Sequence, residues 1–297
     1  MITFQRILFP VDFSTQDHEA APFVKAMAER FQSEVILLHV ADFVPAWYGA
    51  PDTLALETVE GSKSLISDLK SLINERREHL SRHLSADLAG LRVQRTLELG
   101  DPAKEIAKCA HDQKADLIMM PTHGFGPFRR FLLGSVTAKV LHDTDGPVWT
   151  GVHTDQLWSQ KQYQWRRFLC AVDADPKEAP LLQWAAQFST EQKAELRVVH
   201  AVHASAPIPS GQESASLRGF VLDTIEQRMA KLQSDAGTNF DIQVRFGRVG
   251  DIVRDAALEH EADLILIGRG VIQGMLGRLR SEAYTIIREA PCPVISI

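Results

Sequence analysis

The chain carries the same order of segments twice, and this internal duplication constrains its fold more than any other feature. With 297 residues, it has room for two domains of about 150 residues, each large enough for its own core. A repeat of this length predicts two domains of one fold. The matched segments are Ile7–Asp12 with Phe168–Asp173, Glu34–Val40 with Glu195–Ala201, Ala115–Met120 with Ala262–Ile267, and Gly146–Val148 with Cys292–Val294.

Within the first copy, strand-like and helix-like segments alternate, which predicts a parallel sheet with helical crossovers. A polar join over residues 154–165 separates the copies, so we expect domains at 1–153 and 166–297. The expected strands are 6–12, 35–41, 92–98, 116–120 and 147–152, and the expected helices are 16–31, about 54–84, 103–113 and 135–142.

The composition narrows the class of protein. Apolar residues make up 45% and charged residues 24% of the chain, as in ordinary soluble globular proteins. No apolar run reaches membrane-spanning length, and we read the N-terminal stretch as a first strand instead of a signal peptide. Three isolated cysteines fit a reduced, cytoplasmic protein, and a net charge of −6 argues against a nucleic-acid surface. We therefore expect no membrane and no nucleic-acid partner.

One loop of the first copy has features that suit a phosphate. The buried strand 116–120 leads into a loop with Gly124 and Gly126, and Gly134-Ser135 opens the next helix. A helix start presents unpaired backbone N–H groups and the positive end of the helix dipole. The alternative is a strand-to-helix turn without a ligand, since short glycine motifs often match by accident.

Four short motifs together make the chain resemble the universal stress protein family, over nearly its whole length and as two tandem domains. They are Val11-Asp12, His39-Val40, Gly100–Ala103, and Gly124 followed after nine residues by Gly134-Ser135. The nucleotide-binding branch of that family has the pattern G-x-x-G, nine residues, then G-S or G-T. Pro121 stands at the first glycine of this pattern, which removes one backbone N–H.

The resemblance implies two doubly wound five-stranded parallel sheets of strand order 3-2-1-4-5, of the adenine-nucleotide α-hydrolase type. ATP, ADP or AMP would bind above the carboxyl ends of strands one and four, where the strand order reverses. Mg²⁺ could accompany the nucleotide. By matched position, Pro10, Val11 and Asp12 would border adenine and ribose, Val40 would offer backbone hydrogen bonds to adenine, Pro121, Thr122 and His123 would lie in the loop, and Gly124, Gly134, Ser135, Val136 and Thr137 would hold the phosphates.

The second copy of the loop departs further from the pattern. It runs from Gly268 to Ser281, is one residue shorter, and has Arg280 in place of the helix-opening glycine. A side chain there blocks close approach of the backbone to a phosphate. Arg269, Arg278 and Arg280 could still attract an anion by charge. We therefore expect the second domain not to bind nucleotide in the same manner as the first.

Several polar residues have an ordinary structural alternative. Asp12 and Asp173 could each cap the following helix. We expect His39 and His200, at the ends of second strands, to be hydrogen-bonded structural residues. His123 has no nucleophile that the sequence places beside it, and Arg129 and Arg130 could form a phosphate clamp or a solvated turn. We assign no catalytic residue and no metal ligands.

Three hypotheses about function follow. The first is a cytoplasmic stress-response regulatory protein that binds an adenine nucleotide in its first domain. The second is an enzyme, at most a weak ATPase or a nucleotidyl-transfer catalyst, and it ranks lower because the loop shows no placed general base and no acidic Mg²⁺ pair. The third is a partner-docking protein that has lost the ligand.

The two segments that close the domains, 147–152 and 293–297, both have the pattern of a fifth strand. A fifth strand lies at the edge of a 3-2-1-4-5 sheet, and an apolar edge must be covered or paired. We expect the two to pair antiparallel, with Trp149 near the seam, as an intramolecular pseudo-dimer. Two chains could also pair through the same strand, which would give a homodimer.

Overall fold

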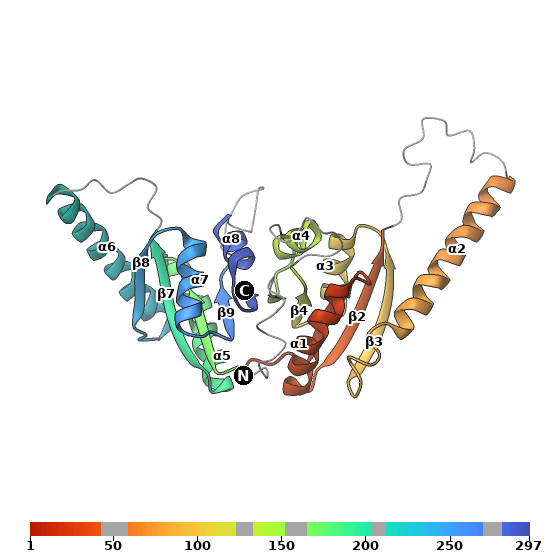
Figure 1. Ribbon diagram of the computed structural model, residues 1–297, viewed down its shortest axis with the longest axis horizontal. Coiled ribbons are helices and arrows are strands. Elements are labelled where there is room, and N and C mark those ends of the chain that lie inside the picture. The colour runs from red at the N-terminus through yellow and green to blue at the C-terminus, as the bar shows by residue number, and fades with distance from the viewer. Residues whose placement is uncertain (43–58, 123–132, 152–164, 203–211, 270–280) are drawn as a thin grey trace. The chain divides into compact units, whose positions relative to one another are not determined.

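A computed structural model describes residues 1–42, 59–122, 133–151, 165–202, 212–269 and 281–297 (Figure 1). The chain divides into two compact units. One is Phe4–Met119, and the other joins Met1–Thr3 to Met120–Ile297. The predicted domain limits, 1–153 and 166–297, follow the sequence repeat instead of this division and stay a prediction.

The unit Phe4–Met119 is a parallel sheet with helical connections, as the alternating pattern predicts (Figure 1). Its strands lie in the order β3-β2-β1-β4, with β2 and β4 pairing in parallel on opposite sides of β1. The elements are β1 (Arg6–Val11), α1 (Thr15–Phe31), β2 (Glu34–Ala41), α2 (Val59–Arg82), β3 (Arg92–Leu99), α3 (Pro102–Asp112) and β4 (Leu117–Met120).

The central strands of this unit are buried on both faces. Ile7, Leu8 and Phe9 of β1 are fully buried, and so are Leu37 and Leu38 of β2. Parallel strands covered on both faces have continuous apolar runs instead of alternation, which is why these runs could be recognised in the sequence. The edge strand β3 is only partly buried and alternates more.

The other unit holds the end of the first repeat and all of the second. Its strand order is β5-β10-β9-β6-β7-β8, in which β10, β9, β6, β7 and β8 run parallel to one another. The elements are α4 (Ser135–Asp143), β5 (Val148–Thr150), β6 (Arg167–Ala171), the 3₁₀ turn η2 (Pro176–Glu178), α5 (Ala179–Gln192), β7 (Glu195–Val202), α6 (Gln212–Ala236), β8 (Ile242–Phe246), α7 (Val249–Glu259), β9 (Leu264–Ile267), α8 (Ser281–Glu289) and β10 (Val294–Ser296).

Strand β5 closes the first repeat as expected. Met120, the last residue of β4, accepts a hydrogen bond from the N–H of Gly151, and β5 follows β4 in the strand order. The predicted order 3-2-1-4-5 is therefore confirmed. Within the described ranges, no helix is both long and apolar enough to cross a membrane.

The two fifth strands pair antiparallel, which confirms the expectation drawn from their edge position. Val294 lies opposite Thr150, Ile295 opposite Trp149, and Ser296 opposite Val148. The indole of Trp149 is 1% exposed, and Ile295 is fully buried. The seam is thus an apolar strip closed by a backbone ladder, so neither β5 nor β10 is an open edge. Assembly into a homodimer stays a prediction.

Candidate functional site

The carboxyl end of β1 is the point where the strand order of the unit Phe4–Met119 reverses. Pro10 and Val11 are buried in the strand, and Asp12 directly follows it with an exposed side chain. Val11 lies opposite His39 of β2, which puts Val40 at the adjoining strand end. Four residues predicted to face adenine and ribose thus come together at one edge of this sheet. Ligands of open α/β sheets bind at this kind of position.

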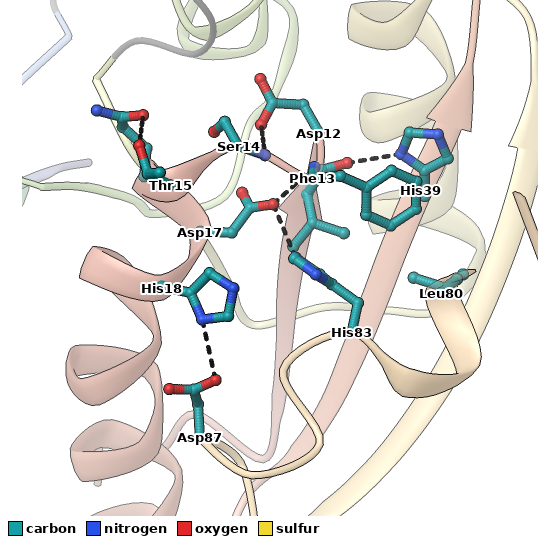
Figure 2. Close-up of polar contacts among 12 residues, drawn as sticks. Asp12, Phe13, Ser14, Thr15, Asp17, His18, His39, Leu80, His83 and Asp87 are labelled. Atoms are coloured by element: carbon teal, nitrogen blue, oxygen red, sulfur yellow. Dashed lines mark hydrogen bonds and ion pairs between the residues drawn. The ribbon is translucent and has the colours of Figure 1, made fainter. Parts of the chain in front are cut away.

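The turn after β1 has an unusual backbone. Phe13 has φ of 65°, a left-handed conformation that non-glycine residues seldom adopt. Asp12 Oδ1 accepts a hydrogen bond from the N–H of Ser14 at 3.0 Å, while Asp17 Oδ2 accepts from the N–H of Phe13 at 2.8 Å (Figure 2). Asp12 thus bonds the N–H of Ser14, the N-cap residue of α1, and does not itself occupy the helix-capping position that was the alternative to a ligand contact. Its carboxylate is also exposed at the strand end, so this bond is compatible with a ligand contact.

A cluster of aromatic rings supports this turn. The ring of Phe13 lies 4.0 Å from that of His39 and is stacked 4.1 Å from that of His79, by ring centroids. His83 Nε2 contacts Asp17 Oδ2 at 2.9 Å, and both side chains are buried (Figure 2). Burial raises the pKa of Asp17, with the hydrogen bond from His83 acting in the opposite direction. The end of α2 is thereby fixed against the turn that presents Asp12.

Sequence reasoning missed this cluster. His79 and His83 are four residues apart at the end of a helical segment, so they share one face, and that spacing was the available signal. Their partners Phe13 and Asp17 lie more than sixty residues earlier. In the described part of the chain, no group of three or more His, Cys, Asp or Glu side chains could hold a metal ion. The contacts that the cluster makes are ring packing and hydrogen bonds.

His39 and His200 are hydrogen-bonded structural residues, as expected. His39 Nδ1 lies 2.9 Å from the carbonyl oxygen of Val11, and His200 Nδ1 lies 2.9 Å from that of Val172. Burial lowers the pKa of both imidazoles. The same contact in both repeats ties the end of each second strand to the end of each first strand, so the duplication extends to single hydrogen bonds.

The start of α4 brings together the described residues of the predicted phosphate loop. The N–H of Gly134 donates to Thr122 O at 2.7 Å, and Thr137 Oγ1 donates to Pro121 O at 3.1 Å. These bonds fold the loop end back onto the residues that follow β4. Gly134 is the N-cap residue of α4 and has no side chain to accept from the helix N–H groups. The amides of Ser135, Val136 and Thr137 have no acceptor within the helix.

Part of the predicted site falls on residues that the structure does not describe. His123, Gly124, Arg129 and Arg130 lie outside the described residues. Among the described ones, Thr137 is 3% exposed and Thr122 is 1% exposed, whereas Ser135 is exposed. The hydroxyl of Thr137 donates to Pro121 O, whereas the side chain of Ser135 is exposed at the start of α4.

The motif Gly100–Ala103 proves to be a helix start. Gly100 has φ of 144°, which favours glycine, and its N–H donates to Ala41 O at 3.2 Å. Asp101 is the N-cap of α3, and its Oδ1 accepts from the N–H of Lys104 at 3.1 Å, with Pro102 at the first helical position. The motif therefore secures the connection from β3 to α3 next to the end of β2.

The second repeat has a small cavity of about 40 Å³ at the carboxyl ends of β6 and β9. It is acidic: Asp173, Glu178 and Glu282 contribute to its lining together with Gly268. A Cβ atom at Gly268 would lie 2.6 Å from Glu178 Oε2, so this carboxylate packs against the first glycine of the loop. Burial, with a smaller contribution from Asp175, raises the pKa of Glu178 to about 7. A phosphate would meet a carboxyl group here.

Arg269, one of the three arginines that could attract an anion, bonds to oxygens of the protein itself. Its side chain is 7% exposed and points to backbone oxygens that follow α4. Nη1 donates to Leu141 O at 3.1 Å and to Thr144 O at 2.6 Å, and Nη2 donates to Gly146 O. Its donors are therefore engaged by carbonyl groups. Arg278 and Arg280 lie outside the described residues.

The fold defines a class of protein: a tandem α/β protein whose two repeats have the same parallel strand order. The model of the universal stress protein family matches residues 3–150 and again residues 164–297. The chain belongs to the universal stress protein family, as two tandem copies.

Individual relatives with similar sequences belong to the same family. The universal stress protein MJ0577 of Methanocaldococcus jannaschii is 32% identical over 152 residues, which cover 50% of this chain and 94% of the relative. The universal stress protein MJ0531 of the same organism is 36% identical over 146 residues, 49% of this chain and 80% of the relative. Each thus matches about half of this chain.

A solved universal stress protein from Archaeoglobus fulgidus matches the whole length. It covers 100% of this chain and 97% of its own, with a TM-score of 0.61 and 21% sequence identity. At this identity, the likeness supports the fold alone.

Proposed function

We propose that this chain is a cytoplasmic stress-response regulatory protein that binds one adenine nucleotide in its first repeat. The start of α4 carries the proposal. A glycine N-cap leaves the first helix amides without a side-chain acceptor, and the loop before it has the spacing of the nucleotide-binding pattern. A helix start of this kind favours a phosphate through its N–H groups and its dipole.

The remaining contacts are assigned by position. Pro10, Val11 and Asp12 would border adenine and ribose, with the Asp12 carboxylate accepting from a ribose hydroxyl. Val40 would offer its backbone to the adenine. Gly124, Gly134, Ser135, Val136 and Thr137 would surround the phosphates, with Ser135 Oγ as a side-chain donor, and Pro121, Thr122 and His123 would shape the loop. Mg²⁺ would screen the phosphate charge when it accompanies ATP.

The second repeat would not take a nucleotide in the same way. The Glu178 carboxyl packs against Gly268, where close backbone approach to a phosphate would be needed, and Asp173 and Glu282 add negative charge to the same cavity. Repulsion between carboxylates and phosphate at short range costs several kcal/mol as an order of magnitude. We therefore propose an asymmetric protein with one competent site.

Calorimetric titration with ATP, ADP and AMP tests the proposal. Gly134→Val puts a branched side chain at the helix start and should abolish binding. Gly219→Val is the matched control, since a Cβ at Gly219 on α6 meets nothing within 4 Å, and it should bind as the wild type does. A folded Gly134→Val protein with unchanged affinity would refute the site, and phosphate release on incubation with ATP would favour the enzyme hypothesis.

A further inference from the structure

The second repeat holds α4 at its carboxyl end through Arg269. The last carbonyl groups of a helix have no partner within the helix and carry the negative end of its dipole. The Arg269 guanidinium donates to Leu141 O, Thr144 O, Thr144 Oγ1 and Gly146 O, which lie in the last turn of α4 and in the link to β5. A buried cation thus satisfies several carbonyls of one helix end at once.

The backbone of Arg269 is anchored as firmly as its side chain. Its N–H donates to Ile297 O at 3.0 Å, and the N–H of Ile297 donates to Ile267 O at 3.0 Å. Arg269 thus continues the β9–β10 ladder, which itself pairs with β5. The guanidinium therefore extends from a residue whose backbone is hydrogen-bonded to the end of the sheet.

The second repeat also contacts the amino end of α4, through Tyr284 of α8. The N–H of Leu133 donates to the Tyr284 hydroxyl oxygen at 3.1 Å. The next residue is Gly134, the N-cap of α4. Together with the bond from Gly134 N–H to Thr122 O, this contact fixes the direction in which the chain enters the helix.

We infer that Arg269 and Tyr284 of the second repeat are positioning residues for the phosphate-binding helix of the first repeat. The inference rests on the proposed function, because α4 is the helix assigned to the phosphates. The loop of the second repeat has a degraded glycine pattern, and its arginine holds the far end of that helix instead of binding a phosphate itself. The site of the first repeat is incomplete without the second repeat.

Three variants test the inference. For each one, the affinity for ATP and the affinity for adenosine are measured and compared with those of the wild type. Tyr284→Phe removes only the acceptor of Leu133 N–H and should weaken ATP about fivefold, the usual effect of one lost hydrogen bond. Arg269→Met should weaken ATP about tenfold or more, and Arg269→Lys should restore part of the loss. Adenosine has no phosphate, so its affinity should change less than about twofold. The control Arg245→Met removes an exposed ion pair with Glu259 and should leave both affinities unchanged.

The outcomes distinguish residues that position the phosphate-binding helix from residues that only stabilise the fold. Wild-type ATP affinity in Tyr284→Phe and Arg269→Met, or an equal weakening of ATP and adenosine, would overturn the inference. If Arg269→Met does not fold, Tyr284→Phe carries the test alone. If the wild-type chain binds no ATP, the proposed function fails, and amide exchange decides the positioning: faster exchange in α4 of Tyr284→Phe supports it, and unchanged exchange overturns it.

Discussion

Replacing Glu178 with glutamine should remove a pH dependence that the buried carboxyl imposes on the stability of the second repeat. Its side chain packs against Gly268 in the acidic cavity, and burial raises its pKa to about 7 from an ordinary value of 4.5. Glutamine has nearly the same shape and no charge. The variant therefore changes the ionisation and preserves the packing.

The direction of the pH dependence of stability follows from the protons bound by the folded and unfolded chains. In the unfolded chain the carboxyl ionises near its ordinary pKa, whereas in the folded chain it keeps its proton until about pH 7. Between these values unfolding releases a proton, so stability falls as the pH rises. One pH unit of pKa difference corresponds to about 1.4 kcal/mol, so wild-type stability should fall by about 2–3 kcal/mol from pH 4.5 to pH 7.5 through this group.

Urea denaturation of both proteins at a series of pH values measures the effect. Glu178→Gln should equal the wild type near pH 5 and exceed it by about 2–3 kcal/mol at pH 8. Glu226→Gln is the control, because Glu226 is exposed on α6, and its profile should follow the wild type. A Glu178→Gln profile parallel to the wild type over the whole range would refute the account of the buried carboxyl.

Other substitutions probe packing that the structure specifies. Gly250→Ala puts a methyl group against Glu289 Oε2 and 2.6 Å from Thr285 Cγ2, both on α8, and should cost about 1–3 kcal/mol by urea denaturation, whereas a methyl group at Gly219 on α6 meets no atom within 4 Å, so Gly219→Ala should gain up to about 1 kcal/mol; equal effects would contradict this packing. His83→Ala removes a buried hydrogen-bond partner of Asp17 and should lower the free energy of unfolding by about 1–3 kcal/mol. The ring of His18 is 56% exposed beside Asp87, so His18→Ala should lower it by less than about 1 kcal/mol. A larger loss in His18→Ala than in His83→Ala would contradict the described cluster. Trp149→Ala leaves a cavity between β5 and β10 and should cost about 3–5 kcal/mol, and slow exchange of the Thr150 and Val294 amides, which face the partner strand, should show the β5–β10 ladder in the wild type; rapid exchange there would reject the pairing.

The repeat made most of the fold predictable from the sequence. Parallel strands buried on both faces have unmistakable apolar runs, and strands Arg6–Val11 and Leu117–Met120 differ from their predicted limits by one residue. The fifth-strand pairing followed from the rule that an apolar edge must be covered. Helix α2 is described from Val59, whereas the pattern placed its start near Leu54, a residue outside the described ranges.

Side-chain partners could not be predicted in the same way. The sequence marks Arg269 as a cation near a glycine, but its acceptors are carbonyls more than a hundred residues earlier, brought close only by the β5–β10 pairing. Glu178, the last residue of η2, lies beside Gly268 much later in the chain, and no local sequence pattern predicts this contact. Contacts of this kind depend on tertiary structure, so composition and spacing do not reveal them.

The number of adenine nucleotides bound per chain tests the central claim most directly. Native mass spectrometry of the purified protein in excess ATP, followed by denaturation to identify the released ligand, gives this number. One bound adenine nucleotide per chain, lost in Gly134→Val and kept in Gly219→Val, is the predicted result. No bound nucleotide, or two equivalent nucleotides per chain, would contradict a single competent site at the start of α4.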